Sequence, residues 1–255
     1  MGKTVRVKDT IIGEGIPKIC VPMTGRTLDQ LLEEAELLKD LSFDVVEWRA
    51  DFFEAVENIE SVSEALRQIR TLLPNKPLIF TFRNAVEGGK KKIEPAYYAE
   101  LNKAMTATRL VDLIDVELFS DAALIQDLVQ TAHDAGVAVI ISNHDFNKTP
   151  PKKEIMARLL KGAELGGDIC KIAVMPKNKT DVMELMDATR MVKEDHGVGP
   201  LIAISMGGLG LISRLSCEIF GSDLTFGAAK KISAPGQVAV DELKRIIELI
   251  HRNMD

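Results

Sequence analysis

A lysine stands inside an apolar run, where a charged side chain is uncommon. Lys171 lies in the middle of DICKIAVM, between Cys170 and Ile172. If this run is a strand, the lysine faces either a barrel interior or a layer of helices, and burial there favours the neutral amine, which can attack a carbonyl carbon. The alternative is a structural lysine that pairs with an acidic residue of another strand, such as Asp115 or Glu117. The lysine by itself leaves both interpretations open.

A histidine in a comparable position favours the catalytic interpretation. His144 lies in SNHDF, at the end of the apolar run that begins at residue 137. Neighbouring strands of a sheet are about 4.8 Å apart, so a histidine at the end of one strand can reach an amine on the next. An amine that forms an imine needs a proton donor and acceptor beside it. The other histidines, His133, His196 and His251, fall in helical or terminal segments and are interpreted as surface residues.

Basic residues near the ends of apolar runs indicate an anionic substrate. Arg49, Arg83 and Arg214 could each bind a carboxylate through two parallel hydrogen bonds, although surface arginines are common. The glycine-rich sequence SMGGLG at 205–210 resembles a phosphate-binding loop, but glycines also simply permit a tight turn. A small anion is therefore the expected ligand.

These residues lie on short apolar runs that alternate with amphipathic segments. The runs with the length and β-branched composition of strands are 18–23, 43–51, 77–83, 113–119, 137–145, 168–174, 200–206 and 224–227. The segments between them have helical spacing, for example LDQLLEEAELLKDL and AALIQDLVQTAHDA. Such alternation over 255 residues is typical of an α/β fold of the (βα)8 TIM barrel type. We expect one catalytic barrel domain over 1–255, with an N-terminal β-hairpin at 4–14 that caps the barrel bottom.

The alternation of side chains along a strand predicts which residues share the barrel interior. In a parallel barrel the active site lies at the C-terminal ends of the strands. Residues two apart there share a face of the strand. These pairs are Glu47 with Arg49, Thr81 with Arg83, and Ser142 with His144, and the residues between them, Trp48, Phe82 and Asn143, must face helices or loops. Charged side chains gathered at one cavity mouth are costly to bury unless they serve a ligand or each other.

The composition narrows the class of ligand and the cellular setting. The net charge is −6 and the pI is 5.4, which leave no overall basic surface for nucleic acid. Cys20, Cys170 and Cys217 are far apart and form no metal-binding pattern, so we expect no metal site and a reducing, cytoplasmic location. Neither a signal peptide nor an apolar run long enough to cross a bilayer is recognised. The expected partner is a small molecule rather than nucleic acid or a membrane.

Six spaced motifs together resemble one known family. They are EWRAD (47–51), TFRNAVEGG (81–89), SNHDF (142–146), CKIAVMP (170–176), SRLSCEIFGSDLTFG (213–227) and SAPGQ (233–237). In this order, along essentially the whole chain, they are similar to the type I 3-dehydroquinate dehydratases of the shikimate pathway, which supplies chorismate and the aromatic amino acids. Six motifs in one order are far more specific than any one of them.

The resemblance implies a lyase that converts 3-dehydroquinate to 3-dehydroshikimate without a metal, nucleotide or external cofactor. It implies that Lys171 forms a Schiff base with the C3 carbonyl, that His144 is the general acid and base, and that Glu87 orients this histidine. The substrate-binding residues that it implies are Glu47, Arg49 and Arg83 for the ring hydroxyls and Arg214, Ser233 and Gln237 for the carboxylate. The loop with the last two resembles a lid that excludes water. The resemblance also implies a homodimer.

Two positions depart from the family pattern. Pro22 stands where some relatives have a small hydroxyl residue, and Cys217 stands where glycine is usual. The first removes a possible minor substrate contact, and the second is expected to affect packing rather than chemistry.

Two other functions remain as alternatives. A class I aldolase or transaldolase also carries an imine-forming lysine on a barrel strand but acts on phosphorylated sugars, so a requirement for a phosphate group would identify it. A catalytically silent barrel could serve as a binding or scaffolding module. The presence of Lys171, His144 and Glu87 together argues against that second alternative.

Overall fold

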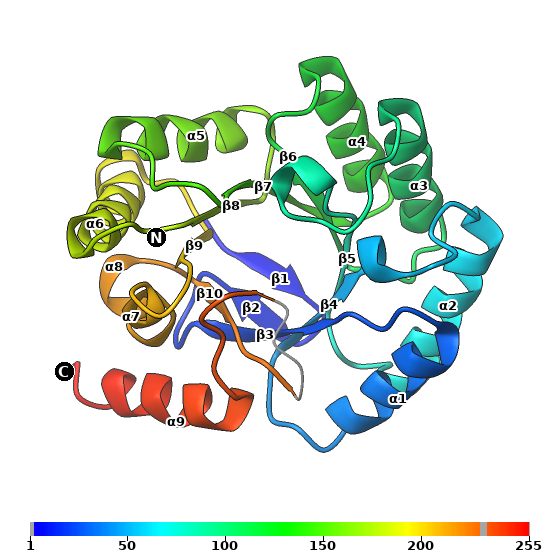
Figure 1. Cartoon of the computed structure of the whole chain (residues 1–255), viewed down its shortest axis with the longest axis horizontal. Coiled ribbons are helices and arrows are strands. Elements are labelled where there is room, and N and C mark those ends of the chain that lie inside the picture. Colours follow the sequence, from blue (N-terminus) through cyan, green and yellow to red (C-terminus); the bar gives the residue numbers. More distant parts are fainter. Residues whose placement is uncertain (1–2, 230–233, 255) are drawn as a thin grey trace.

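Eight parallel strands follow the chain around a barrel (Figure 1). The computed structural model describes residues 3–229 and 234–254. The barrel strands are β3 (Lys18–Met23), β4 (Val45–Arg49), β5 (Leu78–Thr81), β6 (Leu113–Glu117), β7 (Ala138–Asp145), β8 (Ile169–Val174), β9 (Leu201–Ser205) and β10 (Leu224–Phe226). In the sheet β10 lies beside β3, and the remaining strands follow in chain order to β9. The expected TIM barrel is confirmed.

The seam between β9 and β10 is joined by residues that directly precede β10. The backbone amide of Asp223 donates to the carbonyl of Leu201 at 2.7 Å, and the Leu201 amide donates back to the Asp223 carboxylate at 2.7 Å. The Ser222 hydroxyl accepts from the Ala203 amide at 3.0 Å. Side-chain oxygens thus accept hydrogen bonds from backbone amides of β9 at this edge. These contacts join β9 to the segment before β10, so the barrel is nearly closed.

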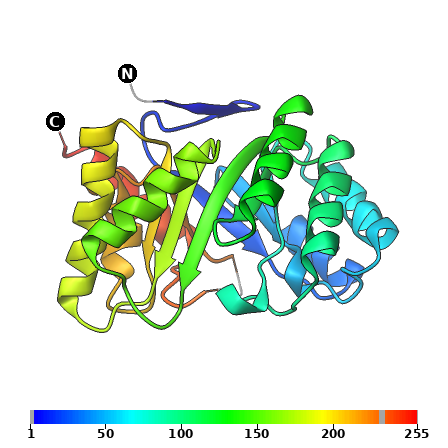
Figure 2. The same ribbon diagram turned by 90° about the horizontal axis from the view of Figure 1, so that it is seen from above.

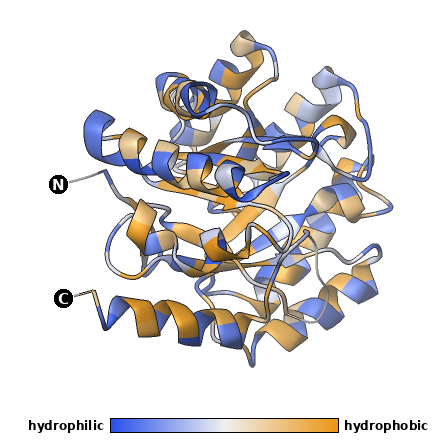
Figure 3. Ribbon diagram, turned by 60° about the vertical axis from the view of Figure 1, so that its left-hand side comes forward, coloured by the Kyte–Doolittle hydropathy of each residue, from blue (hydrophilic) through white to orange (hydrophobic). Residues whose placement is uncertain are grey.

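Helices cover the outside of the barrel. They are α1 (Leu28–Leu38), α2 (Ile59–Leu72), α3 (Pro95–Ala107), α4 (Ala122–Asp134), α5 (Lys152–Glu164), α6 (Lys179–His196), α7 (Leu211–Leu215), α8 (Cys217–Phe220) and α9 (Val240–His251). Several begin at a side-chain cap, as where Asn58 accepts from the Ser61 amide ahead of α2. In that helix Val62, Leu66 and Ile69 are buried at helical spacing. Figure 3 shows strands that are mainly hydrophobic and helices in which both colours alternate.

Side chains on the outer face of the sheet pack against the helices. Trp48 is fully buried and meets Phe53 and Phe80 edge to face, and Phe82 meets Tyr98 in the same way. Asn143 also points outward, because its side-chain oxygen accepts from Arg158 of α5 at 3.2 Å. The predicted outward orientation of Trp48, Phe82 and Asn143 therefore agrees with these contacts.

The lower part of the barrel interior is apolar. We call the following residues the lower layer: Val45, Ile79, Leu113, Ile140, Ile169, Ile202 and Leu224, each with 0% exposure. The hairpin of β1 (Val5–Val7) and β2 (Thr10–Ile12) lies across this end of the barrel (Figure 2). Val7 and Ile12 belong to the same hydrophobic cluster as the lower layer. The expected N-terminal hairpin and its position at the barrel bottom are confirmed.

Three predicted strands end two residues earlier than expected at the opposite end of the barrel. One is the run at 113–119, where β6 ends at Glu117. The run at 43–51 leaves the sheet after Arg49 and continues as the 3-10 turn η1 (Ala50–Phe52). The run at 77–83 leaves after Thr81, and the turn η2 (Ala85–Glu87) follows shortly. Arg83 therefore stands on the loop between β5 and η2.

Residues 3–229 and 234–254 contain no helix that is long and apolar enough to cross a membrane. Within the same residues, no group of three or more acidic, histidine or cysteine side chains is placed to hold a metal ion. Cys20, Cys170 and Cys217 are buried free thiols.

Candidate active site

Lys171 points into the barrel from β8, one inward position above the lower layer. Its Nζ lies 3.4 Å from Glu47 Oε1 and 3.4 Å from Asp115 Oδ2. The same nitrogen stands 4.6 Å from the centre of the Phe226 ring. The side chain is 6% exposed. Of the two carboxylates that the sequence offered as structural partners, Asp115 pairs with Lys171, and Glu47 takes the second place instead of Glu117.

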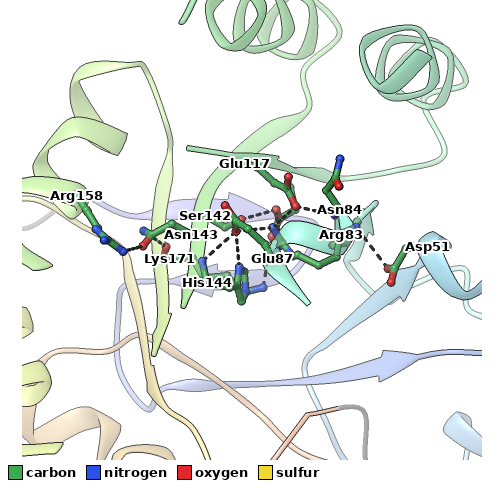
Figure 4. A network of polar contacts seen from close by, with 12 residues as sticks. Asp51, Arg83, Asn84, Glu87, Glu117, Ser142, Asn143, His144, Arg158 and Lys171 are labelled. Carbon is green, nitrogen blue, oxygen red and sulfur yellow. Dashed lines mark hydrogen bonds and ion pairs between the residues drawn. The ribbon is translucent and has the colours of Figure 1, made fainter. Parts of the chain in front are cut away.

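Arg83 is the centre of a buried network of charges (Figure 4). Its guanidinium donates to Asp115 Oδ1 at 2.8 Å and to Glu117 Oε1 at 3.0 Å, and a contact of 3.5 Å reaches Glu87. Burial alone would lower the pKa of Arg83, but these carboxylates raise it above its ordinary value. Burial alone would raise the pKa of Asp115, but Arg83 and Lys171 lower it. Arg83 and Asp115 thus stabilise each other's charge.

Glu87 and His144 are joined by hydrogen bonds although they lie 57 positions apart in the sequence. Glu87 Oε2 accepts from the backbone amide of His144 at 2.9 Å and lies 3.1 Å from its Nδ1. Burial raises the pKa of Glu87 to about 8 and lowers the pKa of His144 well below its ordinary value. Because Nδ1 faces Glu87, Nε2 is the ring nitrogen available to a ligand. His144 lies opposite Ala173 in the sheet, two residues beyond Lys171.

Two further predicted residues are held by short polar contacts. Arg49 donates from Nε to Asp51 Oδ1 at 2.7 Å and from Nη2 to Asp51 Oδ2 at 2.9 Å. Glu47 accepts from the Thr81 hydroxyl at 3.0 Å, on the same oxygen that faces Lys171. Both side chains are therefore fixed before any ligand arrives.

Arg214 is a buried cation at the far wall of the site. Among the residues that the structure describes, its guanidinium reaches only backbone carbonyls, those of Phe226 at 3.4 Å and Pro235 at 3.1 Å, and its Nε has no partner there. No carboxylate among residues 3–229 and 234–254 pairs with it. Burial lowers the pKa of Arg214 to about 10. A buried guanidinium without a counter-ion is suited to bind the carboxylate of a ligand.

These side chains line one cavity of about 250 Å³ at the C-terminal ends of the strands. The predicted site residues in its wall are Glu47, Arg49, Arg83, Glu87, His144, Lys171, Arg214 and Gln237. Ser233, which was also predicted, lies outside the described residues. The wall further contains the apolar side chains Phe52, Phe146, Ile204, Met206 and Phe226. Charged and apolar side chains therefore line the cavity together, as where Phe52 lies against Arg49 and Phe226 against Lys171.

Three residues of the site had no predicted role in it. Asp51 holds Arg49, Phe226 lies beside the lysine amine, and the Ser142 hydroxyl donates to Asp115 at 2.6 Å. Asp51 closes the EWRAD motif, and Phe226 lies on the inward face of its strand, so both had a signal in the sequence. Asp115 was named only as a structural partner, and it also contributes to the charged network.

The glycine-rich loop after β9 serves chain packing. The Gly207 amide donates to the carbonyl of Pro235 at 3.2 Å, so the following segment already occupies it. A Cβ atom at Gly210 would lie 2.1 Å from the backbone oxygen of Ser205. These contacts favour the tight-turn interpretation of SMGGLG over a phosphate-binding loop.

Comparison with known proteins extends the likeness to nearly the whole chain. The family model described as type I 3-dehydroquinase matches residues 19–254. The 3-dehydroquinate dehydratase of Bacillus licheniformis is 54% identical over 254 residues, 100% of both chains, and that of Clostridium novyi is 53% identical over 98% of each. The crystal structure of type I 3-dehydroquinate dehydratase from Clostridium difficile superposes with a TM-score of 0.97 at 52% identity, covering 100% of both chains. This chain therefore belongs to the type I 3-dehydroquinase family.

Proposed function

We propose that this chain is a hydro-lyase that removes water from 3-dehydroquinate through a Schiff base on Lys171. The observation that carries the proposal is one cavity shared by an interior lysine, the Glu87–His144 pair and the guanidinium of Arg214, which has no counter-ion among the described residues. The family membership supports the substrate. The relative from Clostridium difficile is described with covalently modified comenic acid, which supports covalent chemistry in that protein.

Imine formation begins when the neutral Lys171 amine attacks the C3 carbonyl carbon. The carbinolamine then loses one water molecule, and the nitrogen becomes a protonated imine. Glu47 and Asp115, each 3.4 Å from Nζ, lie where they stabilise this positive charge. The ring of Phe226 contributes a second favourable contact with the cation.

Elimination follows from the electron-withdrawing character of the protonated imine. His144 Nε2 takes a proton from C2, and the bond electrons move toward the nitrogen to give an enamine. The enamine expels the C1 hydroxyl, which leaves as water after His144 returns the proton. One water molecule then hydrolyses the product imine, so that the net change is loss of one water from the substrate. Glu87 holds Nδ1 and keeps Nε2 directed at the cavity.

The remaining polar side chains orient the substrate. Glu47, Arg49 and Arg83 line the cavity with side chains suited to hold the ring hydroxyls. Arg214 and Gln237 line the same cavity and are suited to bind a carboxylate. Ser233 is assigned to the same carboxylate by the family resemblance. These assignments fit a ligand that carries both hydroxyls and a carboxylate.

Borohydride trapping tests the proposal. The chain is incubated with 3-dehydroquinate and borohydride, which reduces an imine to a stable amine, and the product is analysed by intact and peptide mass spectrometry. An adduct confined to Lys171 is the expected result. In a His144→Ala variant some adduct should still form while elimination or product release stalls. A folded wild-type protein that gives no adduct contradicts the proposal.

We also propose that the enzyme is a homodimer in the cytoplasm. The family resemblance supports the dimer, and three buried free thiols support a reducing compartment. Size-exclusion chromatography with light scattering should give twice the 28.0 kDa mass of the chain. A mass of one chain would contradict the dimer.

A further inference from the structure

We infer that Asp51 is a positioning residue that couples the grip of Arg49 on the substrate to the placement of the Glu87–His144 pair. The inference rests on the proposed function, because it assigns Asp51 a part in the same reaction. Asp51 is fully buried, with 0% exposure. It does not line the cavity, so it acts through the residues that it holds.

Each carboxylate oxygen of Asp51 accepts from two donors. Oδ1 accepts from Arg49 Nε at 2.7 Å and from the backbone amide of Arg83 at 3.4 Å. Oδ2 accepts from Arg49 Nη2 at 2.9 Å and from the backbone amide of Lys90 at 3.1 Å. Every one of these partners is a donor, so only an acceptor at both oxygens satisfies them all.

The two amides lie at the two ends of the loop that carries Glu87. Within this loop the Ala85 amide donates to the carbonyl of Lys91 at 2.9 Å, so the segment closes on itself. A Cβ atom at Gly89 would lie 1.7 Å from the backbone oxygen of Arg83, which shows how closely the two ends approach. Asp51 therefore fastens a compact loop to the end of β4, and the position of Glu87 depends on that attachment.

The charge of Asp51 also matters for Arg49. The guanidinium uses Nε and Nη2 for the carboxylate, which fixes its plane and leaves its remaining donors for the cavity. Phe52 supports the same guanidinium, whose carbon lies 5.0 Å from the ring centre. Without Asp51 the arginine would lose its bidentate partner and could adopt other rotamers, so the substrate would be held less firmly.

Asp51→Asn is the direct test, because it keeps the shape but replaces one acceptor oxygen with a donor. We expect KM for 3-dehydroquinate to rise about tenfold or more, as for loss of a hydrogen bond to a charged group. The turnover number is measured per Lys171 site trapped with borohydride, so an inactive fraction does not distort it. A purely structural role would reduce the active fraction and leave KM unchanged.

Asp44→Asn is the matched control. Asp44 directly precedes β4 at its other end and accepts the backbone amide of Ile19 at 2.8 Å, far from the cavity. This variant should lower the melting temperature but leave KM unchanged. If folded Asp51→Asn also keeps the wild-type KM, the inference is overturned.

Coupling with Arg49 gives a second readout. If Asp51 acts through Arg49, adding Asp51→Asn to Arg49→Ala should raise KM little beyond Arg49→Ala alone. If the rise of KM in the double variant equals the product of the rises in the two single variants, the two residues act independently and the inference is contradicted. If Asp51→Asn does not fold, Asp51→Glu is tested in its place. Its longer side chain keeps the charge but displaces Arg49, so KM should rise. An unchanged KM in folded Asp51→Glu would overturn the inference. A wild-type chain without turnover and without a borohydride adduct removes the proposed function itself, and the inference with it.

Discussion

The two halves of the barrel interior differ in chemistry although the same strands build both. The lower layer is entirely apolar and is closed by the hairpin. Two residues further along, the inward positions form the upper layer. It is polar or charged on five strands, at Glu47, Thr81, Asp115, Ser142 and Lys171, and apolar on the other two, at Ile204 and Phe226. The upper layer is almost as deeply buried as the lower one, with exposures of at most 5%.

The same degree of burial therefore affects the stability of the fold differently in the two layers. Apolar burial stabilises the fold in proportion to the area removed from water. Buried charges stabilise it little, because their mutual attraction is offset by the loss of hydration. We conclude that the lower layer provides stability, whereas the upper layer provides a preorganised electrostatic environment. Substitutions in each layer can separate these two contributions.

The largest expected effect is the loss of turnover in Lys171→Ala. Turnover should fall by on the order of 10⁴-fold or more, since the variant lacks the amine that we propose as the covalent nucleophile. Circular dichroism should show a folded protein, because the lower layer is intact. Lys161→Ala, at a lysine on α5 that is 55% exposed, is the control and should keep wild-type turnover. Unchanged turnover in Lys171→Ala would rule out the Schiff base mechanism.

A smaller effect, on stability instead of activity, is expected for Ile79→Ala in the lower layer. Removing this fully buried side chain should lower the free energy of unfolding by about 2–5 kcal/mol. Urea denaturation measures the loss, and KM of the remaining folded enzyme should stay at the wild-type value. Met183, 64% exposed on α6, is the control, and Met183→Ala should change stability by less than about 0.5 kcal/mol. A large rise of KM in Ile79→Ala would contradict the separation of the layers.

The smallest expected effect is a pH dependence of the free energy of unfolding that is caused by Glu87 in the cavity wall. Burial raises the pKa of Glu87 from 4.5 to about 8, so the folded chain keeps a proton that the unfolded chain releases. The stabilising contribution of this group is therefore complete below pH 4.5 and is lost as the pH rises to about 8. His144 has the opposite sign, because its lowered pKa destabilises the fold only as the pH falls below its ordinary value.

Glu87→Gln tests that contribution above pH 6.5, where histidine is mostly neutral in the unfolded chain. Relative to this variant, the wild-type free energy of unfolding should fall with rising pH by up to about 1.4 kcal/mol per unit until about pH 8. Urea denaturation at several pH values gives the slope. The loss caused by Ile79→Ala should be the same at each pH. A wild-type slope equal to that of Glu87→Gln would disprove the raised pKa of Glu87.

Much of this architecture could be predicted from local patterns. Alternation along the strand at 168–174 places Lys171 on the same face as Ile169 and Ala173, although it does not tell which face is inward. The same rule separates Glu47 from Trp48, which point to opposite sides of the sheet. Alternating strand and helix segments likewise predict the barrel, since a parallel crossover connection needs a helix of that length.

Contacts between distant segments could not be predicted in this way. Glu87 meets His144 across 57 residues, and whether a glutamate after one strand reaches a histidine on another depends on strand order and stagger. The attachment of Asp51 to the amides of Arg83 and Lys90 depends on how the chain leaves two strands, which no periodicity records.

The sequence by itself determined which side chains share a face of each strand, because that grouping follows from the two-residue period of a strand. It also carried the motifs that indicate the family, and with them the roles that we propose for Lys171 and His144. Only the tertiary structure decided which carboxylate pairs with which cation, for example that Arg83 contacts Asp115 while Arg214 contacts no carboxylate among the described residues. Charge pairing is a property of distances in space, and those distances exist only once the barrel has closed.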